Sequence, residues 1–68
     1  MTKNWVKIYS STNEHQVIIL KEMLMHENII SYSINKKDSS YLFGDIELYV
    51  ESDDVLRALQ IKKTVFEL

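Results

Sequence analysis

The sequence predicts a small α+β domain with the order β-α-β-β-α, in which the helices cover one face of a small sheet. Three segments, 5–10, 29–34 and 45–51, alternate apolar and polar side chains with the period of a β-strand. Two longer segments, 13–30 and 52–63, repeat apolar side chains at helical spacing. Two crossovers on one face of the sheet give the ferredoxin-like arrangement, in which the first and third strands are neighbours.

The first predicted strand presents different side chains on its two faces. Val6 and Ile8 point to one side, which we expect to face the helices. Trp5, Lys7 and Tyr9 point to the other side. Because these three side chains are amphipathic, they indicate a half-exposed sheet face or a contact between subunits.

The first helix begins near three residues that can cap it and ends near an asparagine. The side-chain oxygens of Ser11, Thr12 and Asn13 can each accept a hydrogen bond from the free amides of the first turn. Asn28 is the predicted stop, since Asn tolerates the left-handed conformation. The apolar stripe expected to pack on the sheet comprises Val17, Leu20, Met23 and Leu24.

Two apolar residues of this helix, Ile18 and Met25, lie off that stripe and on a second flank. Each alone is compatible with an ordinary apolar residue at the surface. As a pair they favour a contact with another subunit or a partner.

The remaining strands also have two distinct faces. In the second strand Ile30, Tyr32 and Ile34 share one face, and Ser31 and Ser33 the other. In the third strand Ile46, Leu48 and Val50 are expected to point inward, and Glu47, Tyr49 and Glu51 outward.

The second helix is capped by Ser52, Asp53 and Asp54, with two acids where the helix dipole favours them. Lys62 is expected to lay its stem along the apolar stripe and to keep its amine in water. Residues 64–68 either continue this helix or form a short C-terminal strand. Without that strand, the first strand is an open edge, which favours pairing with another chain.

Length and composition exclude several classes of protein. The 68 residues make a single domain, 1–68, whose small core favours self-association. Cysteine is absent, so disulfides and thiolate chemistry are excluded. A net charge of −2 and a pI near 5.5 provide no basic surface for nucleic acid. No apolar run reaches membrane-spanning length, and no signal peptide is recognisable, so we expect no membrane contact and a cytoplasmic location.

A polar segment between the second and third strands is the best candidate for a ligand-binding site. Its charges and hydroxyl donors could bind an anion. The same residue types also shape turns by bonding to their own backbone. Both readings remain open for the candidate ligand-binding residues, which are Lys36, Lys37, Asp38, Ser39, Ser40 and Tyr41.

Two other groups of polar residues do not indicate catalysis or metal binding. His15 and His26 fall three helical turns apart, about 16 Å along the axis, so one ion cannot bridge them. Glu47 and Glu51 share an outward face, and paired carboxylates can do acid–base work, but nothing in the sequence indicates a pocket around them. We therefore predict no metal, no cofactor and no enzymatic activity.

The outer sheet face is the second candidate surface. Because the first and third strands are expected to be neighbours, Trp5, Tyr9 and Tyr49 should gather there. Aromatic side chains on a sheet can stack nucleic-acid bases, but here they lie among Glu47 and Glu51 rather than basic residues. A protein interface is the better interpretation.

Several segments together resemble a known family. They are the opening strand WVKIYS, the helix end at 27–29, the block NKKDSSY followed by Phe43 and Gly44, and the strand IELYV. Over nearly its whole length the chain is similar to the small bacterial proteins described as prokaryotic signal-transducing proteins. Their fold resembles that of the PII-type nitrogen regulators. The resemblance implies a PII-like fold and a regulatory role, and it brings no catalytic residues.

PII-type regulators bind nucleotides with long loops and basic residues at subunit clefts. This chain is shorter and has no comparable loop, so we do not extend the resemblance to nucleotide binding.

The sequence thus predicts a non-enzymatic regulatory or signal-transducing module that acts by binding and is self-associated. One alternative is an adaptor that recognises a protein by strand addition at the first strand's edge. A small enzyme using the acidic cluster is the least favoured reading.

Overall fold

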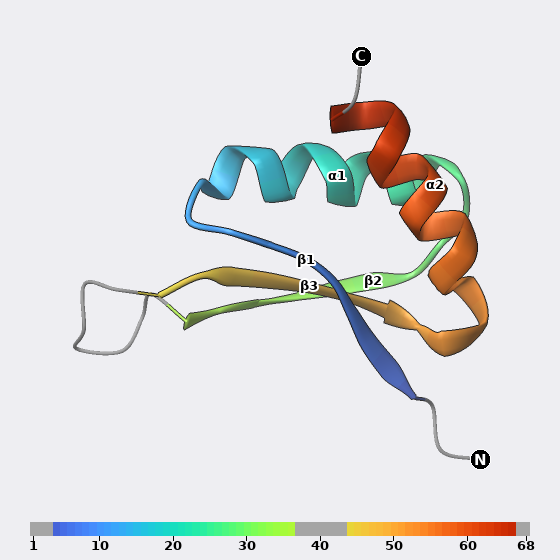
Figure 1. Ribbon diagram of the computed structural model, residues 1–68, viewed down its shortest axis with the longest axis horizontal. Coiled ribbons are helices and arrows are strands. Elements are labelled where there is room, and N and C mark those ends of the chain that lie inside the picture. Colours follow the sequence, from blue (N-terminus) through green and yellow to red (C-terminus); the bar gives the residue numbers. More distant parts are fainter. Residues whose placement is uncertain (1–3, 37–43, 67–68) are drawn as a thin grey trace.

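The computed structural model describes residues 4–36 and 44–66 and shows a three-stranded antiparallel sheet with both helices on one face (Figure 1). The elements are β1 (Trp5–Ser11), α1 (Glu14–His26), β2 (Ser31–Asn35), β3 (Ile46–Glu51), a 3₁₀ turn η2 (Ser52–Asp54) and α2 (Val55–Phe66). The strand order is β1-β3-β2, so β3 is central and pairs with both neighbours. The predicted α+β class and the pairing of the first and third strands are confirmed.

Both ends of α1 are determined by asparagine. Of the three candidate caps, Asn13 is the one used: its Oδ1 accepts a hydrogen bond from the His15 amide at 3.0 Å. At the other end Asn28 has a φ of 61°. Its amide donates to Met25 O, and the Ile29 amide donates to Leu24 O at 2.9 Å. This pair of bonds is a Schellman motif, which ends the helix as predicted.

The core lies between the sheet and the helices. The three inward residues of β3 are buried as predicted. Met23 was expected in the core-facing stripe of α1, but it is exposed, because it lies towards α2, where the helices leave a hollow of about 240 Å³. The buried residues are Ile8, Val17, Leu20, Leu24, Ile29, Ile46, Leu48, Val50 and Ala58.

A β-bulge in β1 overturns the predicted orientation of Tyr9. Lys7 lies opposite Tyr49, but Tyr9 lies opposite Leu48, so the register shifts by one residue at Ile8. Directly opposed residues share a face of the sheet, and Leu48 is fully buried under the helices. Tyr9 therefore faces the helices and packs against the core, instead of joining Trp5 and Lys7 on the outer face.

The apolar face of β2 is turned away from the helices. Tyr32 is paired with Tyr49, and Ile34 with Glu47, both of which point outward. The serines occupy the inner positions, since Ser33 lies opposite Leu48. The apolar alternation in this strand thus supplies the uncovered face of the sheet and not the core.

The chain ends in helix as far as it is described, since α2 continues to Phe66. Residues 67 and 68 lie outside the described residues. β1 is consequently an edge of the described sheet. The amine of Lys62 is not simply in water as expected: it donates a hydrogen bond to Ile8 O at 3.1 Å, at the bulge of that edge strand. Within the described ranges no helix is long and apolar enough to cross a membrane.

Candidate functional site: the outer face of the sheet

Three aromatic rings lie against one another on the outer face of the sheet, opposite the helices. We call Trp5, Tyr32 and Tyr49 the aromatic row. The ring centroids of Trp5 and Tyr32 are 5.5 Å apart, and those of Tyr32 and Tyr49 are 5.8 Å apart. Their planes are inclined by 54° and 44°, within the tilted arrangements that aromatic pairs prefer. Each strand contributes one ring, so the row spans the full width of the sheet.

The row belongs to the molecular surface. Trp5 is 38% exposed and Tyr32 is 45% exposed. Both helices pack on the other face (Figure 1). Large aromatic side chains left uncovered in this way are enriched at protein interfaces.

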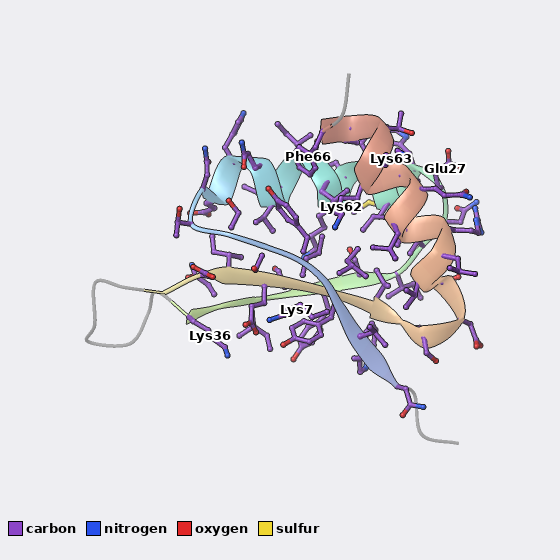
Figure 2. All side chains as sticks on the ribbon, viewed as in Figure 1. Lys7, Glu27, Lys36, Lys62, Lys63 and Phe66 are labelled. Carbon is purple, nitrogen blue, oxygen red and sulfur yellow. The ribbon has the colours of Figure 1, made fainter. Side chains whose placement is uncertain are left out.

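The carboxylate of Glu47 lies beside the row and is surrounded by donors. The Tyr49 hydroxyl donates to Glu47 Oε1 at 2.7 Å. Lys36 Nζ lies 3.3 Å from the same oxygen, and Lys7 Nζ lies 3.5 Å from Oε2. Both lysines are on the side of the sheet away from the helices (Figure 2). The Glu47 side chain is only 12% exposed, so these side chains cover it.

These contacts determine the protonation of the pair. The hydrogen bond from Tyr49, assisted by Lys36 and Lys7, holds the pKa of Glu47 below its ordinary value despite partial burial. The same hydrogen bond is the main cause that raises the pKa of the Tyr49 hydroxyl. At neutral pH Glu47 is therefore an anion with its charge compensated, which is poorly suited to a general acid.

The structure brings together only part of the predicted interface set. Trp5 and Tyr49 share the outer face as expected, whereas Tyr9 is on the helix side. Ile18 and Met25 are exposed on α1, at 44% and 65%, and so lie on the opposite layer from the aromatic row. Met25 borders a hollow of about 370 Å³ that also includes Lys21 and Ile30.

The predicted ligand-binding loop is described only at its margins. Lys36 contacts Glu47, and its amide donates to Asp45 O at 3.1 Å, which holds the two ends of the connection together. The other candidates lie outside the described residues; they are Lys37, Asp38, Ser39, Ser40 and Tyr41. Anion binding by this segment stays a prediction.

Sequence reasoning missed two members of the site, Tyr32 and Lys7. Tyr32 was recognised as part of an apolar strand face, but the face could not be assigned to the outer side. A usable signal was the apolar character of Tyr32 and Ile34 together with the aromatic Tyr49 in the neighbouring strand. Lys7 was placed on the correct face, but its pairing with Glu47 depends on strand register.

No metal-binding constellation is present in the part of the chain that the structure describes, where no three His, Asp or Glu side chains are close enough to hold an ion. His15 and His26 are exposed near opposite ends of α1. Glu51 lies opposite Trp5 in the sheet, and Tyr49 lies between Glu51 and Glu47 along β3. The arrangement is suited to packing against another surface.

Comparison with known proteins gives no further identification: no family model, no curated protein and no solved structure matches the chain significantly.

Proposed function

We propose that this protein is a small non-enzymatic regulatory module that acts by binding and self-associates through the outer face of its sheet. The observation that carries the proposal is the aromatic row, in which Tyr32 contacts both Trp5 and Tyr49 on a face that the helices leave uncovered. In a domain this small, burying such a face adds substantially to a limited core.

The charges on this face favour a second copy of the chain as the partner. Lys7 and Lys36 are both directed to the Glu47 carboxylate, and Glu51 lies on the same face opposite Trp5, so two positive and two negative charges lie beside the row within one subunit. A two-fold interface brings identical patches together. With the charges of the face balanced, two such faces meet without strong like-charge repulsion, and a partner of opposite charge is not required.

The edge of β1 is less favourable as a docking site for an added strand. The bulge at Ile8 interrupts the regular hydrogen-bonding geometry of β1, and the Lys62 amine donates a hydrogen bond to the Ile8 carbonyl. Bulges and lysines are devices by which proteins prevent edge-to-edge pairing. The adaptor that works by strand addition is therefore the second choice.

The fold assignment and the regulatory role are parts of the same proposal. We infer a ferredoxin-like arrangement lacking the fourth strand, supported by the β-α-β-β-α order and by β3 lying between β1 and β2. The regulatory role rests on the resemblance to the prokaryotic signal-transducing proteins, which also suggests a bacterial, cytoplasmic protein.

The proposal is tested by the mass in solution, measured by light scattering over a dilution series. We expect a mass of twice 8.1 kDa at high concentration, falling to 8.1 kDa on dilution. Tyr32→Ser should shift this transition to higher concentration by tenfold or more, the range of a central interface residue. Because Trp5 is the only tryptophan, its emission should shift with the mass.

The matched control is Leu56→Ser, which changes an exposed apolar residue of α2, in the opposite layer. It should leave the transition unchanged. A monomer at every concentration, or an equal effect of the two substitutions, would contradict self-association through the outer face.

A further inference from the structure

A groove of about 680 Å³ lies on the helix side of β1, beside the last turns of α2. Its volume falls within the range of small-molecule sites. The aromatic row lies on the other side of the sheet, so the groove is separate from the surface proposed above. The described residues that line the groove are Tyr9, Gln16, Leu59, Lys62, Lys63 and Phe66.

Two features of the fold build this groove. The four lining residues of α2 follow the spacing i, i+3, i+4, i+7, which places them on one face of the helix. The neighbouring face, with Ala58, packs into the core. The bulge turns Tyr9 to the helix side, where its ring stacks on Phe66 with centroids 4.9 Å apart and planes at 17°. The groove thus has a flat aromatic wall.

The polar groups of the groove are mainly donors. Lys62 Nζ uses one N–H on Ile8 O, which fixes the amine at the groove and leaves two N–H donors. The Lys63 side chain is exposed and makes no hydrogen bond or ion pair with another described residue. Gln16 Oε1 accepts from the hydroxyls of Tyr9 and Ser11, which leaves the Gln16 amide group as a donor.

The charge of the groove contrasts with that of the chain. The net charge of the protein is −2, yet no described lining residue is acidic and two are lysines. Two ammonium groups without a carboxylate attract an anion, and stacked aromatic rings next to them offer a surface for a flat apolar group.

We propose that this groove binds a small amphipathic anion, namely a flat apolar ring that carries a carboxylate or a phosphate. The ring packs against Tyr9 and Phe66, and the anionic group lies near Lys62 and Lys63. The proposal goes beyond self-association and does not depend on it, because the two surfaces lie on opposite sides of the sheet.

The test is an NMR titration of backbone amides at constant ionic strength with benzoate, phenyl phosphate and benzylamine. Both anions should cause saturable shifts confined to β1, the start of α1 and residues 59–66, with a Kd of about 1 mM or tighter for at least one of them. The tighter anion identifies the preferred head group. Benzylamine carries the same ring with a positive charge and should not saturate.

Two lysine substitutions distinguish anion binding in the groove from non-specific attraction of anions to the protein surface. Lys63→Gln should weaken anion binding at least fivefold, whereas Lys21→Gln, which removes the same charge beside the hollow at Met25, should leave the Kd unchanged. Phe66→Leu keeps an apolar side chain and removes the ring, so it should weaken binding too. Shifts spread over the whole surface, equal binding of benzylamine, or equal effects of the two lysine substitutions would overturn the proposal.

Discussion

Replacing Lys62 by Met should destabilise the fold, because Lys62 is the partner of the Ile8 carbonyl at the β1 bulge. The variant keeps a long flexible stem of nearly equal helix propensity, so the helix itself is little affected. The change removes one charge-assisted hydrogen bond from a partly buried site. Such bonds contribute about 1.5–3 kcal/mol when fully protected. Since water reaches part of this site, we expect a loss of about 1 kcal/mol.

The loss converts to a measurable shift in Tm. Unfolding entropies of about 2.1 cal/mol/K per residue give about 0.14 kcal/mol/K for this chain, so 1 kcal/mol lowers the Tm by about 7 °C. Thermal unfolding followed by far-UV circular dichroism resolves this difference. Leaving this carbonyl of an edge strand without its partner should also increase aggregation of the variant on heating.

Lys63→Met is the matched control, since it changes the neighbouring lysine, which has no described partner. Its Tm should stay within about 3.5 °C of the unchanged protein, the shift that corresponds to the roughly 0.5 kcal/mol of ordinary surface substitutions. If Lys62→Met and Lys63→Met lower the Tm equally, the hydrogen bond to Ile8 is not what stabilises the edge, and the reasoning is refuted.

Substitutions at three further positions test the fold and the candidate site. Asn28→Val should destabilise by about 1–2 kcal/mol in urea unfolding, because the φ of 61° is unfavourable for a β-branched residue, whereas Asn28→Gly should be neutral or stabilising. Leu48→Ala should remove about 2–5 kcal/mol from a domain whose total stability is about 3–5 kcal/mol, because Leu48 is fully buried. Circular dichroism should therefore show the variant largely unfolded. A cooperative transition near the original Tm would count against the buried position of Leu48. Glu47→Gln should lower the Tm at neutral pH by an amount that disappears in acid. The folded pKa of Glu47 is depressed, so its contribution is present above the ordinary value of 4.5 and is lost as the pH falls through the lower folded value. A Tm difference that is the same at pH 7 and below that range would show that the charge of Glu47 is not involved.

The candidate site could be predicted in part. Trp5 and Tyr49 were correctly placed on the outer face, because alternation with a period of two assigns faces wherever a strand is regular. Tyr9 was placed wrongly because one additional residue at the bulge reverses every face beyond it. Nothing in WVKIYS marks the position of that residue, since the bulge follows from how β1 pairs with β3.

The sequence by itself determined the order of the elements and both ends of α1. The cap at Asn13, the stop at Asn28 and the inward residues of β3 follow from local hydrogen bonding and from side-chain periodicity, which act over a few residues. It also determined that β1 and β3 would lie together, once the order of elements was known.

Only the tertiary structure decided which chemistry the surface displays. The direction of Tyr32, the compensation of Glu47 by Lys7 and Lys36, and the contact of Lys62 with Ile8 all join residues from different elements. Each depends on strand register and helix placement to within one residue. Those are set by packing of the whole core, and a periodic pattern within one segment carries no information about them.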